Sequence, residues 1–244
     1  MTPEHLFVLC LAVAVVAFLY SCVGHAGASG YISVMTLAGI AVAVIRPTAL
    51  TLNIFVACIG AIQFWRAGYF SWQLFWPFAL LSVPCSAIGG YISLPTHWLK
   101  LLIGLTLLYS ALRFFVQAKE QENVQPPSRI VALAVGAGLG LLSGLTGTGG
   151  GIFLTPLMIF LGWGKTKTVA AVSVVFILVN SVSGLAGTLL KSGSIPSLAW
   201  MLIPAAALGG VFGSYLGSKR FSPVVIKRIL AVVLIVAAYK LIVQ

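Results

Sequence analysis

Two glycine-rich segments hold the residue types of this sequence that could bind a charged solute. The first is Gly-His-Ala-Gly-Ala-Ser-Gly at residues 24–30, and the second is Thr-Gly-Thr-Gly-Gly-Gly at residues 146–151. Each lies in a stretch without Asp, Glu, Lys or Arg. Glycine runs interrupt a helix, and the backbone N–H groups that begin the next helix attract an anion. The hydroxyls of Ser29, Thr146 and Thr148 add neutral donors, so these segments favour anion binding without a buried Lys or Arg.

The candidate substrate-binding residues lie in these two segments or on the neighbouring apolar stretches. They are Gly24, His25, Gly27, Ser29, Gly30, Asn53, Thr146, Gly147, Thr148, Gly149, Gly150, Gly151, Ser173 and Asn180. Asn53 aligns with Ser173 when the chain is compared with itself at an offset of 120 residues. A second interpretation stays open for all of them, because polar side chains also join membrane helices and glycines also permit close helix packing.

His25 is the only ionisable side chain in the first segment. In a membrane it could carry a coupling proton or donate to an anion, or it could stay neutral and bind a backbone carbonyl. A sodium ion at backbone carbonyls and uncoupled flow are the alternatives to proton coupling.

The composition places these segments in a membrane protein. Of 244 residues, 60% are hydrophobic and 7% are charged, against roughly 25% charged residues in a soluble domain. A soluble fold of this size would have too few polar side chains to cover its surface. The lipid bilayer is therefore the expected partner of most of the surface, and no nucleic-acid partner is expected.

Acidic residues are nearly absent, which excludes several kinds of chemistry. The three acids are Glu4, Glu120 and Glu122, and the chain has no Asp. A carboxylate proton relay within the membrane and a carboxylate cage for a divalent metal are therefore not expected. The four cysteines form no C-x-x-C pair, so neither a zinc site nor thiol–disulfide chemistry is indicated. We expect no cofactor and no metal.

The chain consists of two similar halves that follow one another, a tandem duplication. At the 120-residue offset, Pro84 falls on Pro204, and the pair Gly89–Gly90 falls on Gly209–Gly210. We predict a first membrane repeat at 1–116, a hydrophilic cytoplasmic linker at 117–129 and a second membrane repeat at 130–244.

Each half divides into five apolar elements, and the predicted fold is an all-α polytopic membrane protein whose helices are broken at the glycine-rich segments. The expected elements are 5–23, 28–45, 48–65, 72–93, 97–116, 130–145, 150–163, 168–190, 196–217 and 223–243. Because five is odd, the second repeat should be inverted relative to the first. Whether 28–45 and 150–163 cross the membrane fully or re-enter it is left open.

The basic residues orient this topology. With ten crossings, ten of the bases lie on the linker side, which the positive-inside rule places in the cytoplasm. The loops on the other side hold the remaining four, Arg46, Lys100, Lys191 and Lys240.

The sequence resembles the TauE/SafE family of membrane proteins. The resemblance rests on Gly-Leu-Thr-Gly-Thr-Gly-Gly-Gly-Ile-Phe-Leu-Thr-Pro-Leu at 144–157, Lys-Thr-Lys-Thr-Val-Ala-Ala-Val-Ser-Val at 165–174, Asn180-Ser181 and Lys191-Ser-Gly193. It implies a multi-pass transporter of the bacterial inner membrane, not an enzyme, that carries sulfite, sulfonates or related organosulfur anions. The first glycine-rich segment departs from the family pattern.

These features favour a transporter that works by alternating access between the two halves, with the anion bound at the two helix breaks. A non-transport membrane assembly factor is the main alternative. An intramembrane serine protease using Ser29 is a weaker one, because such an enzyme needs a His within reach of the serine. The sequence leaves open which anion is carried, in which direction, with which coupling ion (H⁺ or Na⁺) and in which oligomeric state.

Overall fold

The computed structural model describes residues 3–22, 25–92, 94–115, 124–217 and 223–243. These residues form ten helices and no strand, which confirms the all-α fold class. The helices are α1 (Pro3–Cys22), α2 (Ala28–Leu37), α3 (Val42–Arg66), α4 (Trp72–Tyr91), α5 (Thr96–Phe115), α6 (Arg129–Thr146), α7 (Gly151–Phe160), α8 (Thr166–Ser192), α9 (Ser197–Gly217) and α10 (Pro223–Val243).

Six of the described helices are long and apolar enough to cross a membrane, namely α1, α3, α4, α6, α8 and α9. By contrast, α2 and α7 have ten residues each. At about 1.5 Å per residue they extend roughly 15 Å, half the hydrocarbon thickness of a bilayer. Neither short helix is therefore long enough to cross on its own.

The predicted boundary between the second and third elements was wrong. The second helix already ends at Leu37, and α3 begins at Val42 and continues through Arg46 and Pro47. Proline here is the sixth residue of the helix, so its missing N–H removes one hydrogen bond close to the helix start. The Arg46–Pro47 pair is a sequence pattern typical of a loop, but here it lies within a helix.

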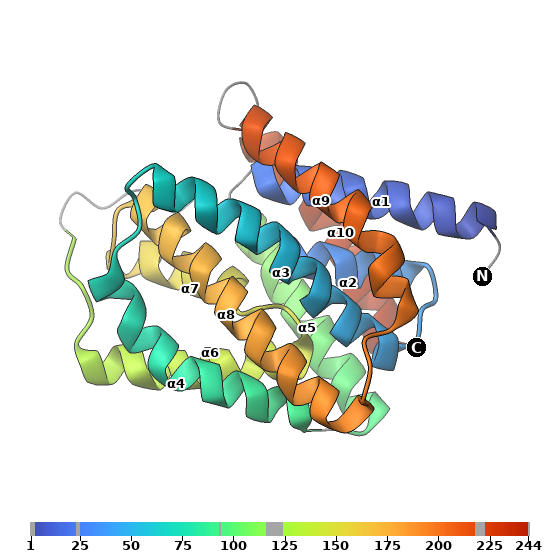
Figure 1. Ribbon diagram of the computed structural model, residues 1–244, viewed down its shortest axis with the longest axis horizontal. Coiled ribbons are helices and arrows are strands. Elements are labelled where there is room, and N and C mark those ends of the chain that lie inside the picture. Colours follow the sequence, from blue (N-terminus) through green and yellow to red (C-terminus); the bar gives the residue numbers. More distant parts are fainter. Residues whose placement is uncertain (1–2, 23–24, 93, 116–123, 218–222, 244) are drawn as a thin grey trace.

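The longest helices, α3 and α8, form the centre of the molecule. In the most apolar 18-residue segment of each, about two thirds of the residues are buried. The corresponding share is about a third or less in α1, α6 and α9. Large apolar side chains on the peripheral helices point outward, as expected of surfaces that face lipid. In Figure 1, α3 and α8 run diagonally through the middle, with α4 and α6 along one side and α1 and α9 on the other.

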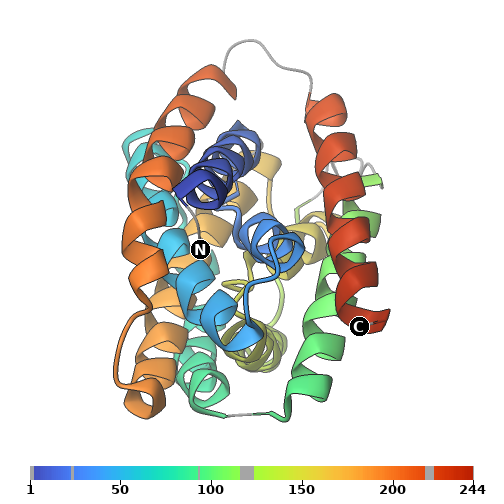
Figure 2. The same ribbon diagram turned by 90° about the vertical axis from the view of Figure 1, so that its right-hand side faces the viewer.

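Helices from the two halves pair with each other. The first half contributes α1, α3, α4 and α5, which pack respectively against α9, α8, α6 and α10 of the second half. The view in Figure 2 shows α9 and α10 on opposite flanks, with α1 and α6 seen nearly end-on between them. The described part of the predicted linker, from residue 124, leads into α6, where the Ser128 hydroxyl accepts a hydrogen bond from the Val131 N–H.

Several glycines serve helix packing alone. Along α6, a Cβ at Gly136, Gly140 or Gly144 would overlap the backbone of Phe78, Ser82 or Ser86 on α4, respectively. On α9, Gly209 and Gly213 lie in the same way against Ala14 and Phe18 of α1. These contacts follow the small-x-x-x-small pattern of membrane helices, in which missing side chains let two backbones approach.

Candidate functional site

The second glycine-rich segment is a true break between two helices. One helix, α6, ends at Thr146, and α7 begins at Gly151. Between them, Gly149 and Gly150 both have φ of 76°. A residue with a Cβ would be strained in this left-handed conformation by about 1–2 kcal/mol. The break therefore depends on glycine at these two positions.

The first segment forms the matching break between α1 and α2. Gly27, with φ of 100°, immediately precedes Ala28, the first residue of α2. The Ser29 hydroxyl lies 2.7 Å from the Tyr20 hydroxyl, and both side chains are buried. Gly24 lies outside the described residues.

Residues of both breaks line one small cavity. Its lining residues are Tyr20, His25, Ala26, Gly27, Ala28, Ser29, Asn53, Thr148, Ile152 and Ile177. The cavity volume is about 10 Å³, which is room for roughly one water molecule. The structure thus brings the two breaks together around one small cavity.

Asn53 joins the two halves at this cavity. Its side-chain Nδ2 donates to the Thr148 carbonyl at 3.4 Å and to the Ser181 hydroxyl at 3.3 Å. Its Oδ1 is buried without a hydrogen-bond partner among the described residues. Asn53 is the twelfth of the 25 residues of α3, so the cavity lies near the middle of a helix long enough to span the membrane.

The electrostatics of the cavity favour a negative charge. The N-termini of α2 and α7 both reach it, through Ala28 and Ser29 on one side and Ile152 on the other. First-turn N–H groups have no partner within their helix, and the helix dipole makes this end partly positive. No carboxylate is among the lining residues.

The hydroxyls of the second break form a short chain. Thr146 donates to the Leu142 carbonyl at 2.7 Å and lies 2.9 Å from the Thr148 hydroxyl. Both side chains are buried, and Thr148 lines the cavity itself.

The glycines of this segment lie against specific neighbours. A Cβ at Gly149 would be 2.6 Å from Asn53 Nδ2, and a Cβ at Gly150 would be 2.9 Å from the Phe176 ring. Gly151 lies against Ile177 and the Ser173 carbonyl. Ser173 is buried, and its hydroxyl has no hydrogen-bond partner among the described residues.

Five of the thirteen candidates that the structure describes line the cavity, namely His25, Gly27, Ser29, Asn53 and Thr148. The other eight do not, namely Gly30, Thr146, Gly147, Gly149, Gly150, Gly151, Ser173 and Asn180. Asn180 faces α4, where its Oδ1 accepts from Ser82 at 2.6 Å and its Nδ2 donates to the Phe176 carbonyl at 2.9 Å. Gly30 packs against Val16 and Tyr20 of α1. Sequence reasoning missed Tyr20, Ile152 and Ile177, which line the cavity but carry no distinctive motif.

The environment of Arg46 differs most from the one predicted. Arg46 was expected in a loop, yet it lies in α3 with 7% of its surface exposed. Its Nη1 donates to the carbonyls of Ile92, at 3.3 Å, and Leu145, at 3.5 Å. Its Nη2 donates to the Gly90 carbonyl and, at 3.1 Å, to the Thr188 hydroxyl. A buried cation therefore lies close to the second break, contrary to the expectation that the interior holds none.

A metal centre is not indicated in the described part of the chain, where no three His, Cys, Asp or Glu side chains gather.

Comparisons with known proteins agree with this architecture. Residues 9–241 match the family model described as "Sulfite exporter TauE/SafE". The chain is 40% identical over 239 residues to the probable membrane transporter protein y4hK of Sinorhizobium fredii, covering 96% of both chains. It is 26% identical to the probable membrane transporter protein YjnA of Bacillus subtilis, covering 93% of this chain and 96% of that one. A probable membrane transporter protein of Haemophilus influenzae is also 26% identical, over 82% of each chain.

No solved structure matches the chain. The family match spans nearly its whole length, the 40% identical relative is covered almost end to end, and the helices are apolar and multiple. This multi-pass membrane protein therefore belongs to the TauE/SafE family of membrane transporters.

Proposed function

We propose that this protein carries a small sulfur-containing anion, such as sulfite or a sulfonate, across the bacterial inner membrane. The proposal rests on the cavity shared by the two helix breaks. Two helix N-termini meet there, near the middle of α3, and no carboxylate lines the cavity. The description of the family as sulfite exporters supports the substrate class.

The proposed binding residues are those that reach this cavity. Ser29 and Thr148 supply hydroxyls, and the first turns of α2 and α7 supply backbone N–H groups. Asn53 supplies an amide N–H once its bond to the Thr148 carbonyl breaks. Partly positive helix ends combined with neutral donors suit a small oxyanion that must be released again, because each such interaction is weaker than a buried ion pair.

Alternating access is the proposed mechanism. The cavity has room for roughly one water molecule, so an anion can enter only if the two halves move apart. The pairing of α1 with α9 and of α4 with α6 supports two repeats related by a pseudo-two-fold axis, because equivalent helices exchange partners between the halves. The odd number of elements in each repeat favours inversion. We place the linker in the cytoplasm by the positive-inside rule.

His25 is the proposed coupling group. It lines the shared cavity, and it also lines a second cavity of about 20 Å³ together with Gln63 on α3 and Ser214 on α9. A proton on His25 would add positive charge beside the anion.

Flux measurements test this function. Proteoliposomes containing the purified protein should accumulate or release radiolabelled sulfite or methanesulfonate faster than empty liposomes, with saturable kinetics. Sulfate and chloride, offered separately, define the selectivity. Absence of flux for every organosulfur anion, in both orientations of the gradient, would exclude the transporter and favour a membrane assembly factor.

The protease alternative receives a direct test in the same preparation. Replacing Ser29 with Ala would abolish an activity that uses its hydroxyl as nucleophile. We expect anion flux in this variant to decrease and no peptide cleavage in either protein, because Ser29 is paired with Tyr20 at the wall of the anion cavity.

A further inference from the structure

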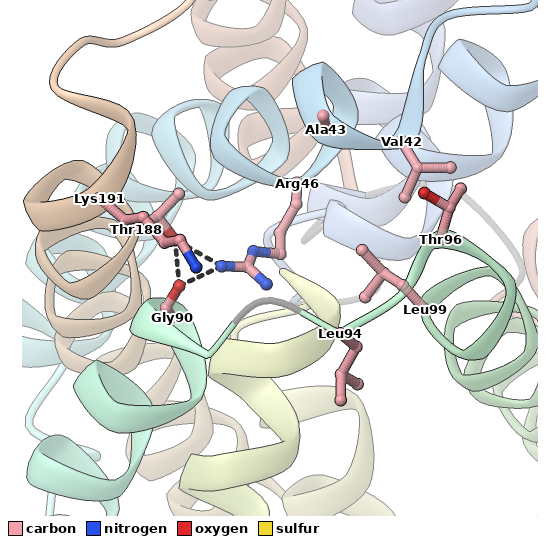
Figure 3. A pocket seen from close by; sticks show the side chains of 9 residues that line it. All are labelled: Val42, Ala43, Arg46, Gly90, Leu94, Thr96, Leu99, Thr188 and Lys191. Carbon is pink, nitrogen blue, oxygen red and sulfur yellow. Dashed lines mark hydrogen bonds between the residues drawn. The ribbon is translucent and has the colours of Figure 1, made fainter.

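Another, larger cavity lies at the N-terminal end of α3, next to the C-terminal ends of α4 and α8. Its volume is about 240 Å³, and its polar lining residues are Arg46, Thr96, Thr188 and Lys191. Gly90 and the apolar side chains of Val42, Ala43, Leu94 and Leu99 complete the lining. Figure 3 shows the Arg46 guanidinium and the Lys191 amino group pointing into the same part of this cavity. We call it the Arg46 vestibule.

Three helix ends surround the guanidinium. The carbonyls of Gly90 and Ile92 belong to the end of α4, the Leu145 carbonyl to the end of α6 and the Thr188 hydroxyl to the last turns of α8. These groups satisfy N–H donors, and helix C-termini are partly negative, which explains how a cation is tolerated here. Every acceptor is nevertheless uncharged, so Arg46 has no full counter-charge among the groups it bonds.

Lys191 adds a second positive charge to the same cavity. It lies in the last turn of α8, one helical turn after Thr188, and it is exposed, whereas Arg46 is 7% exposed. Two cations facing one cavity repel each other, and no lining residue is acidic. An anion between them would relieve this repulsion, with the Lys191 ammonium as its N–H donor. The guanidinium would act mainly through its charge, because its Nη atoms already donate to protein acceptors.

The vestibule adjoins the second helix break. A Cβ built on Gly147 would lie 2.8 Å from Cγ of Arg46, and Leu145, one of the Arg46 acceptors, is two residues before that glycine. Arg46 thus lies between the vestibule and Gly147, the residue that precedes Thr148 at the small cavity.

We propose that the Arg46 vestibule is a second anion-binding site, which holds a small oxyanion between Arg46 and Lys191 before it reaches the helix breaks or after it leaves them. This inference rests on the proposed function for its choice of ligand. The available volume of about 240 Å³ is much more than one water needs, so a small oxyanion fits with some of its hydration water.

Equilibrium binding to the purified protein in detergent tests the site without requiring transport. Radiolabelled sulfite is the probe, and binding is compared among the wild type, Lys191→Gln and Lys240→Gln. Both variants remove one lysine charge, but Lys240 donates to the Leu37 carbonyl and does not line the vestibule. We expect Lys191→Gln to weaken sulfite binding by about two- to fivefold, as for one exposed charge, and Lys240→Gln to bind like the wild type.

Arg46→Lys tests the buried residue. It keeps the charge but loses the planar fork that fixes three helix ends around the vestibule, and we expect sulfite binding about tenfold weaker or more. Because this residue also joins three helix ends, a thermal melt accompanies each measurement. If Arg46→Lys is unfolded, the comparison of Lys191→Gln with Lys240→Gln decides, because Lys191 is exposed and its replacement leaves the helix contacts in place.

The outcomes separate this site from the transport proposal. Equal sulfite affinity in the wild type and Lys191→Gln would overturn the vestibule even if flux is normal, as would a wild type that binds no sulfite. Binding that depends on Lys191 in a protein without flux of any sulfur anion would retain the vestibule and overturn the transport proposal.

Discussion

Asn53 and Thr148 come from opposite halves of the chain, and the Asn53 Nδ2 donates to the Thr148 carbonyl at 3.4 Å beside the small cavity. The bond connects the middle of α3 to the backbone of the second helix break. Any movement that opens the cavity between the halves must therefore lengthen or break it. At 3.4 Å the hydrogen bond is longer than most, and such a weak contact can be broken and formed again during a transport cycle.

Replacing Asn53 with Asp should abolish transport. The substitution keeps the shape of the side chain but places a carboxylate where two partly positive helix N-termini meet, so the protein would carry its own anion in the site. It also changes the N–H donor to Thr148 into an acceptor that faces a carbonyl. We expect sulfite flux in proteoliposomes to decrease at least tenfold while the protein stays inserted.

Asn180→Asp is the matched control, because Asn180 is equally buried but faces α4. A carboxylate there would repel the Phe176 carbonyl and lower the stability by about 1–3 kcal/mol. We expect a lower melting temperature with an unchanged half-saturation concentration for sulfite. A parallel loss of flux in both variants would contradict the assignment of Asn53 to the site.

Gly149→Ala should impair transport beyond what backbone strain alone explains. The new Cβ would lie 2.6 Å from Asn53 Nδ2 and 2.9 Å from the Ser181 hydroxyl, in a backbone with φ of 76°. Strain of about 1–2 kcal/mol adds to an overpacking cost of about 1–3 kcal/mol. We expect a lower melting temperature and a severalfold decrease in the rate of sulfite flux.

Gly68→Ala separates strain from contact. Gly68 has nearly the same φ, 74°, but nothing lies within 4 Å of the position of its Cβ. Only the backbone strain should remain, so this variant should lose about 1–2 kcal/mol of stability and keep its flux. If Gly149→Ala behaved like Gly68→Ala in both measurements, the close fit at the second break would have no functional role.

Gly140→Ala should destabilise the pairing of α4 with α6. A methyl group at this position would overlap the backbone of Ser82, which cannot move away as a flexible side chain could. Gly138→Ala, two residues away on the same helix, meets nothing within 4 Å and replaces glycine by a better helix former. We expect the first variant to melt at least several degrees below the wild type and the second to melt at or above it. Equal melting temperatures would contradict the packing role of the α6 glycines.

The ten helices could be predicted from the sequence because lipid imposes long charge-free stretches, and the glycine runs marked where they break. The boundary at Arg46 could not. A lone arginine followed by Pro47 suggests a loop, and the groups that stabilise it inside the protein are mainly carbonyls, which every residue has. Three of its four acceptors, Leu145, Ile92 and Thr188, lie at least 46 residues away, and nothing in their side-chain pattern indicates the contact.

The proximity of the two helix breaks could be predicted, because the offset between the halves aligned them. Which polar residues of α3 and α8 face the cavity could not be read in the same way. Asn53 and Asn180 are both buried in apolar helices, yet only Asn53 lines the cavity, while Asn180 binds Ser82 of α4. That choice depends on the rotation of each helix about its axis, which several neighbouring helices determine together.

His25→Gln should remove the dependence of sulfite flux on a proton gradient. His25 lines both the shared cavity and the cavity of about 20 Å³ beside Gln63, so a proton on it would lie next to the bound anion. An imposed pH gradient should accelerate flux in wild-type proteoliposomes, and the ratio of flux with and without the gradient should approach one in the variant. His97→Gln is the control, because His97 packs edge-on against Trp98 and lines neither cavity. Acceleration by a sodium gradient, with no response to pH in the wild type, would instead identify Na⁺ as the coupling ion and contradict the role of His25.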